Sequence, residues 1–284
     1  MRIPTRDAET MTTRLLAVWG DPIAHSKSPT LHGAAIRVLG LDWEYGRREV
    51  DADGFSAALR GLDDSWRGLS LTMPLKEQAF RAAQTHDRHA ELTGAVNTLL
   101  LNAAPSGFNT DVGGIIDAFA ENEVTGAARA RILGAGATAA SALVAVAEMG
   151  AHRIDVRARR PERTQTLRAL GERLGVEVTV SGFADQIGPV DVTVATLPGG
   201  AVLERTAAFA EHGGILLDVA YAPWPSALAE AWATEHVISG VGMLLHQAVR
   251  QVRVFVHGDP VDELDDEATV LAAMRTALRE PAPS

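Results

Sequence analysis

A glycine-rich turn between an apolar strand and an alanine-rich helix most constrains the fold of this chain. Residues 131–139 read Arg-Ile-Leu-Gly-Ala-Gly-Ala-Thr-Ala and lead into a helix predicted over 138–149. Gly134 permits the tight turn, Gly136 lets the backbone approach a pyrophosphate, and Ala139 allows close packing of strand on helix. The helix N-terminus adds N–H donors and a positive partial charge. In this context the turn predicts a Rossmann-type dinucleotide-binding unit, with a purely structural turn as the alternative.

Strand-like and helix-like segments alternate along the chain, which is typical of an α/β fold with a parallel or mixed sheet. The pattern predicts strands over residues 15–19, 43–50, 68–73, 95–101, 131–133, 153–158, 176–180, 190–195, 215–219 and 236–238. It predicts helices over residues 29–39, 55–62, 74–83, 111–121, 138–149, 161–174, 226–234, 243–257 and 262–278. The helix after Asp111 is the natural domain boundary, and residues 131 to about 240 form one dinucleotide-binding unit. A length of 284 residues allows two medium domains.

The composition excludes several classes of protein. With 46% hydrophobic and 22% charged residues, the chain has the composition of an ordinary globular protein and not of a disordered or fibrous one. No apolar run reaches the roughly 18 residues of a membrane span. The net charge of −10 argues against a nucleic-acid partner, which would need a basic face.

The cysteine and histidine content and the N-terminal sequence bear on the cellular compartment and on metal binding. The absence of cysteine removes thiolate chemistry and fits a cytoplasmic protein, and the nine histidines show no metal-ligand spacing, so no metal is expected. The polar first 13 residues show no signal-peptide pattern, and Met11 is an alternative start. Residues 280–284 are predicted to be poorly ordered.

Lysine is scarce, and one lysine is a candidate acid/base. Only Lys27 and Lys76 among the 26 basic residues are lysine, which unlike arginine can lose its proton at a reachable pH. Pro74 should place Lys76 in the first turn of a helix, where the helix dipole and partial burial disfavour the charged ammonium. Lys76 is therefore a candidate general acid/base, with a surface lysine as the alternative. Asp111 could orient Lys76 or cap the following helix, and the two roles are compatible.

Two further polar clusters are candidate contacts for a small polar ligand. Ser26 and Ser28, at the start of a predicted helix, could cradle a carboxylate, although Ser28 could simply be an N-cap with Pro29 in the first turn. Asn97 could hydrogen bond to a ligand hydroxyl, and an asparagine in a turn is the alternative.

The end of the second cofactor strand indicates which dinucleotide binds. Arg159 and Arg160 follow the strand and favour a 2′-phosphate, hence NADP. Asp155 would be the acidic residue of an NAD site, but it lies too early in the strand to reach a ribose. Two solvated arginines are disfavoured, because cations at a helix N-terminus need an anion.

Six segments in a fixed order resemble the shikimate dehydrogenase family. They are residues 20–29, 71–76, 94–98, 109–111, 134–136 and 240–247. The resemblance runs from about residue 15 to about residue 257, and Tyr221-Ala-Pro-Trp-Pro225 resembles the form found in actinobacterial-type members.

The resemblance implies an α/β enzyme of two domains with the active site in the cleft between them. An N-terminal α/β substrate-binding domain over 12–112 would be joined by closing helices over 243–280, and a C-terminal Rossmann-type NADP-binding domain would span 113–242. Such an enzyme reduces 3-dehydroshikimate reversibly to shikimate in aromatic amino-acid biosynthesis. A quinate/shikimate dehydrogenase using NAD and a non-catalytic shikimate-binding sensor are the alternatives. The family implies a small-molecule substrate and a monomer or homodimer.

The resemblance also assigns roles to individual residues. Lys76 would be the acid/base, paired with Asp111. The substrate carboxylate would lie on Ser26 and Ser28, and its ring hydroxyls would contact Thr72, Asn97, Asp111 and Gln247, with Tyr221 lining the site. The cofactor would contact Gly134, Ala135, Gly136, Ala137, Thr138, Arg159, Arg160, Thr196 and Gly240.

The sequence departs from the common family pattern at four points. Ser70 stands where Asn is frequent, and Ala137 stands where a third glycine is usual. Residues 158–160 read Ala-Arg-Arg instead of Asn-Arg-Thr, and residues 194–196 read Val-Ala-Thr instead of Asn-Ala-Thr. None of these removes a proposed catalytic group; Ser70 bears on substrate preference and residues 158–160 on cofactor preference.

Overall fold

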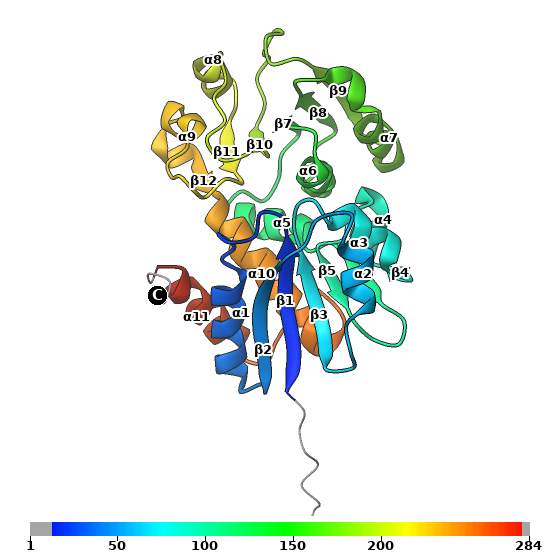
Figure 1. Cartoon of the computed structure of the whole chain (residues 1–284). Coiled ribbons are helices and arrows are strands. Elements are labelled where there is room, and N and C mark those ends of the chain that lie inside the picture. Colours follow the sequence, from blue (N-terminus) through cyan, green and yellow to red (C-terminus); the bar gives the residue numbers. More distant parts are fainter. Residues whose placement is uncertain (1–12, 280–284) are drawn as a thin grey trace, which may run out of the picture.

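The computed structural model describes residues 13–279 and forms two lobes (Figure 1). The predictions for the N-terminal segment, for a start at Met11 and for residues 280–284 concern positions outside this range. Between residues 13 and 279, no helix is both long and apolar enough to cross a membrane.

The N-terminal lobe contains a mixed six-stranded sheet in the order β2-β1-β3-β5-β6-β4. Its strands are β1 (Arg14–Gly20), β2 (Trp43–Glu49), β3 (Trp66–Leu71), β4 (Thr85–His86), β5 (Thr98–Leu100) and β6 (Ser106–Phe108). Strands β1, β2 and β3 are parallel, whereas β5 runs antiparallel to both β3 and β6.

Helices cover both faces of this sheet (Figure 1). One face packs against α2 (Phe55–Arg60), α3 (Lys76–Ala82) and α4 (Arg88–Thr93). The other face is covered by α1 (Ser28–Leu39), α10 (Gly240–His257) and α11 (Glu267–Arg279). The two C-terminal helices therefore complete the N-terminal lobe.

The second lobe is a parallel sheet in the order β12-β11-β10-β7-β8-β9. Its strands are β7 (Arg129–Leu133), β8 (Arg153–Arg157), β9 (Glu177–Ser181), β10 (Val192–Ala195), β11 (Ile215–Asp218) and β12 (Val237–Ser239). Counted within this lobe, the order is that of the doubly wound dinucleotide-binding fold, 3-2-1-4-5-6. The prediction of a Rossmann-type unit is thus confirmed.

Two groups of helices sandwich the second sheet. Helices α5 (Asp111–Glu121), α6 (Ala137–Glu148) and α7 (Gln165–Leu174) share one apolar core with β7 and β8. Helices α8 (Thr206–Glu211) and α9 (Ala227–Ala231) pack in a separate core with β10 and β11.

Several predicted boundaries were wrong. The helix predicted over 161–174 is a 3-10 turn, Pro161–Arg163, followed by α7. Helix α9 is shorter than the predicted 226–234, and a second 3-10 turn occupies Thr234–His236. Helix α10 starts at Gly240, three residues before the predicted 243. Short elements, namely β4, α4, β6 and α8, were not predicted, because segments of two to six residues show too little periodicity.

Helices α5 and α10 carry the chain between the two lobes and cross at Gly114. A Cβ added at Gly114 would lie 2.7 Å from Gln247 Cβ and 2.9 Å from the Gln247 backbone nitrogen. Only glycine permits this approach, because neither contact can relax without moving a backbone. The predicted boundary between residues 112 and 113 falls within α5, and that between 242 and 243 falls within α10.

His32 is a buried histidine on α1 within the N-terminal core. Its ring stacks on Tyr45 with centroids 4.0 Å apart, and its Nδ1 donates to the Ser28 carbonyl at 2.9 Å. Burial lowers the pKa of His32 to about 4, against smaller opposing contributions from the Ser28 carbonyl and the Gln251 side chain. The ring is therefore neutral in the folded protein at neutral pH.

We expect Gly114→Ala to destabilise the protein by about 1–3 kcal/mol, because the new methyl group overpacks the crossing of α5 and α10. Gly242→Ala on α10 is the matched control, since its Cβ would lie 3.5 Å from Ala118 Cβ, an ordinary contact. Because alanine has a higher helix propensity than glycine, the Gly242→Ala protein should be as stable as the parent or slightly more stable. Urea unfolding of the three proteins measures the difference, and equal midpoints would contradict a tight crossing.

The free energy of unfolding should also decrease as the pH falls from about 6.5 towards 4. In this window the unfolded chain binds a proton at His32 that the folded chain does not, which lowers stability by up to about 3 kcal/mol. His32→Gln removes this titration and should flatten the pH dependence, whereas the control His257→Gln alters an exposed ring. Urea titrations between pH 4.5 and 7 measure the slopes. An unchanged slope in His32→Gln would show that His32 does not contribute.

Candidate active site

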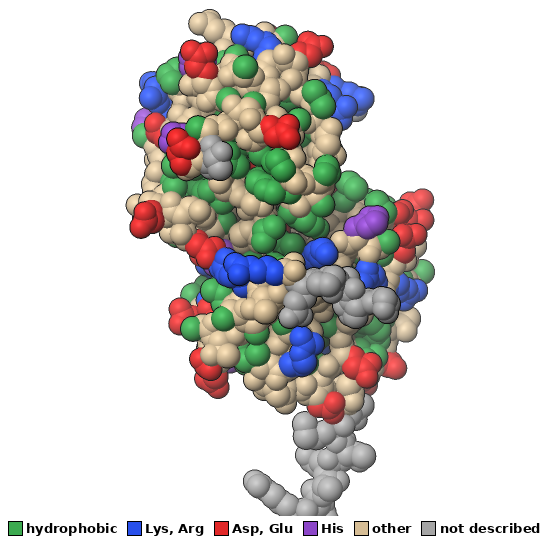
Figure 2. Space-filling view, turned by 90° about the vertical axis from the view of Figure 1, so that its left-hand side faces the viewer, with side chains coloured by type: hydrophobic (Ala, Val, Ile, Leu, Met, Phe, Trp, Pro, Cys, Tyr) green, Lys and Arg blue, Asp and Glu red, His purple; other side chains and the backbone are tan. Residues whose placement is uncertain are grey.

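A cavity of about 360 Å³ lies between the two lobes, at the ends of β1, β3 and β11. Figure 2 shows the waist between the lobes, where hydrophobic side chains gather above a row of Lys and Arg side chains. The wall of the cavity includes all the predicted catalytic and substrate-binding residues: Ser26, Ser28, Thr72, Lys76, Asn97, Asp111, Tyr221 and Gln247. Two predicted cofactor contacts, Thr138 and Gly240, also line it. The cavity thus brings the predicted substrate residues together with two of the nine predicted cofactor contacts, whereas Ala135, Gly136 and Ala137 line a separate pocket beside α6 and α7.

Ser26 and Ser28 lie at the N-terminus of α1. The helix starts at Ser28 with Lys27 at the N-cap, so the alternative in which Ser28 caps the helix is wrong. Instead, the Ser28 N–H donates to Ser26 Oγ at 3.3 Å, and Pro29 occupies the first turn as predicted. Both hydroxyls can still donate to an anion, because serine oxygens rotate their hydrogens to suit a partner.

Lys76 is the first residue of α3, with Leu75 at the N-cap. Pro74 therefore precedes the helix instead of fixing its first turn. It belongs to a turn closed by the Leu75 N–H, which donates to the Thr72 carbonyl at 2.8 Å, and the Met73–Pro74 peptide bond is cis. This turn sets the direction in which α3 leaves β3 and brings Lys76 to the cavity.

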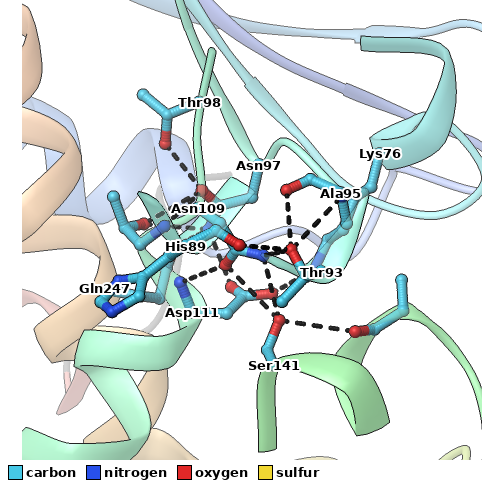
Figure 3. Close-up of polar contacts among 12 residues, drawn as sticks. Lys76, His89, Thr93, Ala95, Asn97, Thr98, Asn109, Asp111, Ser141 and Gln247 are labelled. Atoms are coloured by element: carbon cyan, nitrogen blue, oxygen red, sulfur yellow. Dashed lines mark hydrogen bonds and ion pairs between the residues drawn. The ribbon is translucent and has the colours of Figure 1, made fainter. Parts of the chain in front are cut away.

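Lys76 and Asp111 form a largely buried ion pair (Figure 3). Lys76 Nζ lies 2.5 Å from Asp111 Oδ2, and the side chains are 13% and 6% exposed. Asp111 is the first residue of α5, and Thr110 holds the N-cap position, so the predicted capping role of Asp111 is wrong by one residue. The predicted pairing of Lys76 with Asp111 is confirmed.

Asn97 holds Asp111 from the opposite side (Figure 3). Its Nδ2 donates to Asp111 Oδ1 at 2.8 Å, and its Oδ1 accepts from the Thr110 N–H at 2.9 Å. Gln247 Oε1 lies 3.4 Å from the same Asn97 nitrogen. Asn97 is 2% exposed, and most of its hydrogen-bonding capacity is used by the protein. It therefore orients the carboxylate that is paired with Lys76.

The remaining predicted substrate contacts come from three separate elements. Thr72 follows β3 and Gln247 lies on α10, where its Nε2 donates to the Leu244 carbonyl at 2.8 Å. Tyr221 follows β11, and burial raises the pKa of its hydroxyl, which therefore stays protonated and can donate a hydrogen bond.

The glycine turn has the shape that a pyrophosphate needs. Gly134 has a φ of +121°, and a Cβ there would lie 2.4 Å from Thr196 Oγ1. Around Gly136, which caps α6, a Cβ would meet nothing within 4 Å, so the turn is open to a ligand. Ala137 is the first helical residue, and the first N–H groups of a helix have no partner within it. These residues fit a dinucleotide phosphate group.

The end of β8 carries free positive charge. Arg159 and Arg160 are exposed just beyond the strand, and neither forms an ion pair with any residue between 13 and 279. Asp155, by contrast, is held by Arg131 Nε and Arg157 Nε, both at 2.9 Å. Both carboxylate oxygens of Asp155 are therefore paired within the sheet. Arg159 and Arg160 are the charged side chains at the end of β8 that are free to contact a cofactor.

Sequence reasoning missed several residues of the cavity. His25, Val219, Met243 and Leu244 line it, as do Ser70, noted only as a family departure, and Gln251. Two spacings could have pointed to the last two. Gln251 follows Gln247 by four residues on one helix face, and Ser70 precedes Thr72 by two residues on one strand face. Among residues 13–279, no three His, Asp or Glu side chains gather as metal ligands.

Comparisons with known proteins agree with this geometry. Residues 18–99 match the model of the shikimate dehydrogenase substrate binding domain. The shikimate dehydrogenase (NADP(+)) of Methanothermobacter thermautotrophicus is 33% identical over 269 residues, which cover 89% of this chain and 95% of that protein. The corresponding protein of Rubrobacter xylanophilus is 34% identical, covering 92% and 95% of the two chains.

Solved structures show the same arrangement of both lobes. The crystal structure of Mycobacterium tuberculosis shikimate dehydrogenase matches with a TM-score of 0.81 and 37% identity, covering 93% of this chain and 99% of that one. A Thermus thermophilus shikimate 5-dehydrogenase, crystallised with NADP(H) and shikimate, matches with a TM-score of 0.75 and 27% identity, covering 93% and 100%. The relatives extend over nearly the whole chain, and the chain belongs to the shikimate dehydrogenase family.

Proposed function

We propose that this chain catalyses the NADP-dependent, reversible reduction of 3-dehydroshikimate to shikimate. The observation that carries the proposal is the buried pair of Lys76 and Asp111 in a cavity that the cofactor lobe also lines, through Thr138 and Gly240. A protonated lysine in this pair can supply the proton that a ketone needs when it becomes an alcohol. The family and the NADP(+) in the names of its members support the same reaction.

The substrate is held at two ends of the cavity. Ser26 and Ser28 donate to its carboxylate at the N-terminus of α1, where the helix dipole favours an anion. Its ring hydroxyls contact Thr72, Asn97, Asp111 and Gln247, and Tyr221 lines the site. Of these residues, Asp111 is paired with Lys76. The carbonyl to be reduced therefore lies beside Lys76.

Lys76 is the proton donor in the direction of reduction. Its Nζ gives a proton to the oxygen of the carbonyl as negative charge develops there, and it takes a proton from the hydroxyl in the reverse direction. Asp111 holds the Lys76 ammonium at 2.5 Å and fixes its direction, and Asn97 in turn fixes Asp111. These contacts pre-organise the donor before the substrate enters.

The cofactor fits the second lobe. The turn from Gly134 to Thr138 would hold its pyrophosphate, Arg159 and Arg160 its 2′-phosphate, and Thr196 and Gly240 would lie near its nicotinamide half. When bound, NADPH supplies the hydride. The two lobes would exclude water from the cavity between them.

We also propose that the chain works in the cytoplasm on small molecules, as a monomer or homodimer. The lack of cysteine supports a reducing compartment, and a net charge of −10 disfavours nucleic acid as a partner. Light scattering coupled to gel filtration measures the oligomeric state.

Lys76→Ala should lower kcat by about 10²–10⁴-fold while KM for shikimate changes much less, because the proton donor is lost. Lys76→Arg is the sharper variant, since it keeps the charge but cannot release a proton. Lys27→Arg, at the other lysine, should keep the parent kcat. Initial rates followed by the absorbance of NADPH measure these values. Parent-like turnover by Lys76→Arg would contradict the acid/base role.

A two-by-two assay of shikimate or quinate with NADP or NAD should give strong turnover only with shikimate and NADP. Replacing both Arg159 and Arg160 with Ser should raise KM for NADP about 10–100-fold and change KM for NAD little, because two charge-assisted hydrogen bonds to the 2′-phosphate are lost. Arg153→Ser, at the opposite end of β8, is the control.

Each contrary result has its own meaning. Preferred turnover of quinate with NAD would assign the chain to catabolic quinate oxidation. Folded protein that is inactive with all four pairs would favour a ligand-binding sensor.

A further inference from the structure

A buried amide links the two lobes beside the catalytic pair (Figure 3). Asn109 lies between β6 and α5 and is only 1% exposed. Its Nδ2 donates to Thr93 Oγ1 at 2.9 Å and to Ser141 Oγ at 3.1 Å, and its Oδ1 accepts from the Asp111 N–H at 3.1 Å. Asn109 does not line the cavity, so any effect it has on the reaction acts through other residues.

The partners of Asn109 fix the orientation of its amide. The backbone N–H of Asp111 can only donate, so it faces Oδ1, and Nδ2 faces the two hydroxyls. Thr93 Oγ1 gives its one hydrogen to a backbone carbonyl of α4 at 2.7 Å and therefore accepts from Asn109. The Ser141 hydroxyl accepts from Asn109 as well, and it can give its own hydrogen to Asn109 Oδ1 or to the Ala137 carbonyl, both at 3.4 Å. Both amide hydrogens of Asn109 are thus used.

Two of these contacts join the segments that carry the catalytic carboxylate and the side chain that orients it. Thr93 ends α4, and its Oγ1 also accepts from the Ala95 N–H at 3.3 Å, in the segment that leads to Asn97. Asp111 starts α5 and holds the proposed proton donor. The Asn109 amide therefore sets the position of the Asn97 segment relative to the first residue of α5.

The third contact reaches the cofactor lobe. Ser141 lies on α6, one turn after Ala137, which is the first residue of that helix, and it is 1% exposed. Gly136 and Ala137 belong to the turn that fits a pyrophosphate. The start of α6 and the start of α5 are therefore joined through the side chains of Ser141 and Asn109.

We propose that Asn109 is a positioning residue that fixes the start of α5 against α6, so that Asp111 holds the proton donor at a set distance from the cofactor. The inference rests on the proposed function, because it takes Lys76 as the donor and the glycine turn as the cofactor site. During reduction the carbonyl group takes a hydride at its carbon and a proton at its oxygen. The groups that supply them come from different lobes, and a misplacement of about 1 Å can slow such a reaction about 10²-fold.

Asn109→Ala should lower kcat about 10–100-fold and leave KM for shikimate and for NADP within about threefold, because the chemical step loses its geometry while the contacts to both ligands remain. Ser141→Ala removes only the contact with α6 and should lower kcat about three- to tenfold. Thr93→Val, which keeps the shape of the side chain without the hydroxyl, should have a similar effect, and Thr93→Ser should restore the parent kcat. Initial rates at saturating shikimate and NADP measure these values.

A double variant tests whether Ser141 acts through Asn109. The kcat of Asn109→Ala with Ser141→Ala should lie within about twofold of that of Asn109→Ala alone, because both substitutions remove the same contact. Glu148→Gln is the matched control. Glu148 ends α6 and pairs with Arg88 and His89 of α4, so it joins the two lobes without touching Asn109. That variant should keep kcat within about twofold, since exposed ion pairs contribute little.

A kinetic isotope effect separates positioning from a purely structural role. With shikimate deuterated at the carbon that is oxidised, the deuterium effect on kcat in Asn109→Ala should be at least as large as in the parent, because hydride transfer becomes the slower step. Thermal unfolding verifies that each protein is folded at the assay temperature. If Asn109→Ala is not folded there, Ser141→Ala and Thr93→Val, which each remove one hydroxyl, test the inference in its place.

The outcomes separate this inference from the proposed function. Variants that lose thermal stability but keep the parent kcat would overturn the positioning role, and so would an isotope effect that falls towards one. Independent, multiplying losses in the double variant would overturn the connection through Ser141. In each of these cases an active parent leaves the proposed function standing. A folded parent that does not turn over shikimate with NADP would overturn the proposed function and this inference with it.

Discussion

The site depends on the close approach of α5 and α10 at Gly114. Helix α5 begins with Asp111, and α10 carries Gln247 and Gln251, so the spacing of the two helices sets the distance between residues that lie far apart in sequence. The contact also lies where the chain passes between the lobes. The absence of a side chain at Gly114 therefore affects both the connection between the lobes and the shape of the cavity, because packed helices transmit small displacements.

The buried charged groups of the cavity are paired with each other before any ligand arrives. Lys76 and Asp111 are buried as an ion pair, and Asn97 donates a hydrogen bond to the second oxygen of the Asp111 carboxylate. An unpaired charge at this depth would be strongly destabilising. Asp155 follows the same rule in the other lobe, where Arg131 and Arg157 take both of its oxygens. Arg159 and Arg160, where a ligand is proposed to bind, have no ion pair among residues 13–279.

Features encoded by local sequence were predicted well, and those formed between distant elements were not. The glycine turn and the strands of the second lobe follow from periodicity and from motifs of a few residues. The pairing of Lys76 with Asp111 is the exception, because it joins two helices and was predicted as a possible role of Asp111 and from the family resemblance. The start of α3 was misplaced because Pro74 belongs to a turn before the helix. The contacts of Tyr45 and Gln251 with Ser70 were missed because they join elements that are far apart in the sequence.

The return of α10 and α11 to the first lobe also affects the order in which the two lobes can complete their folding during synthesis. On the ribosome, the whole dinucleotide-binding lobe emerges before the helices that cover one face of the N-terminal sheet. Until then the apolar side of α1, with Leu31 and Ala35, has nothing to pack against. A nascent chain halted after β12 would hold a complete second lobe beside an unfinished first one, with exposed apolar surface for chaperones to bind.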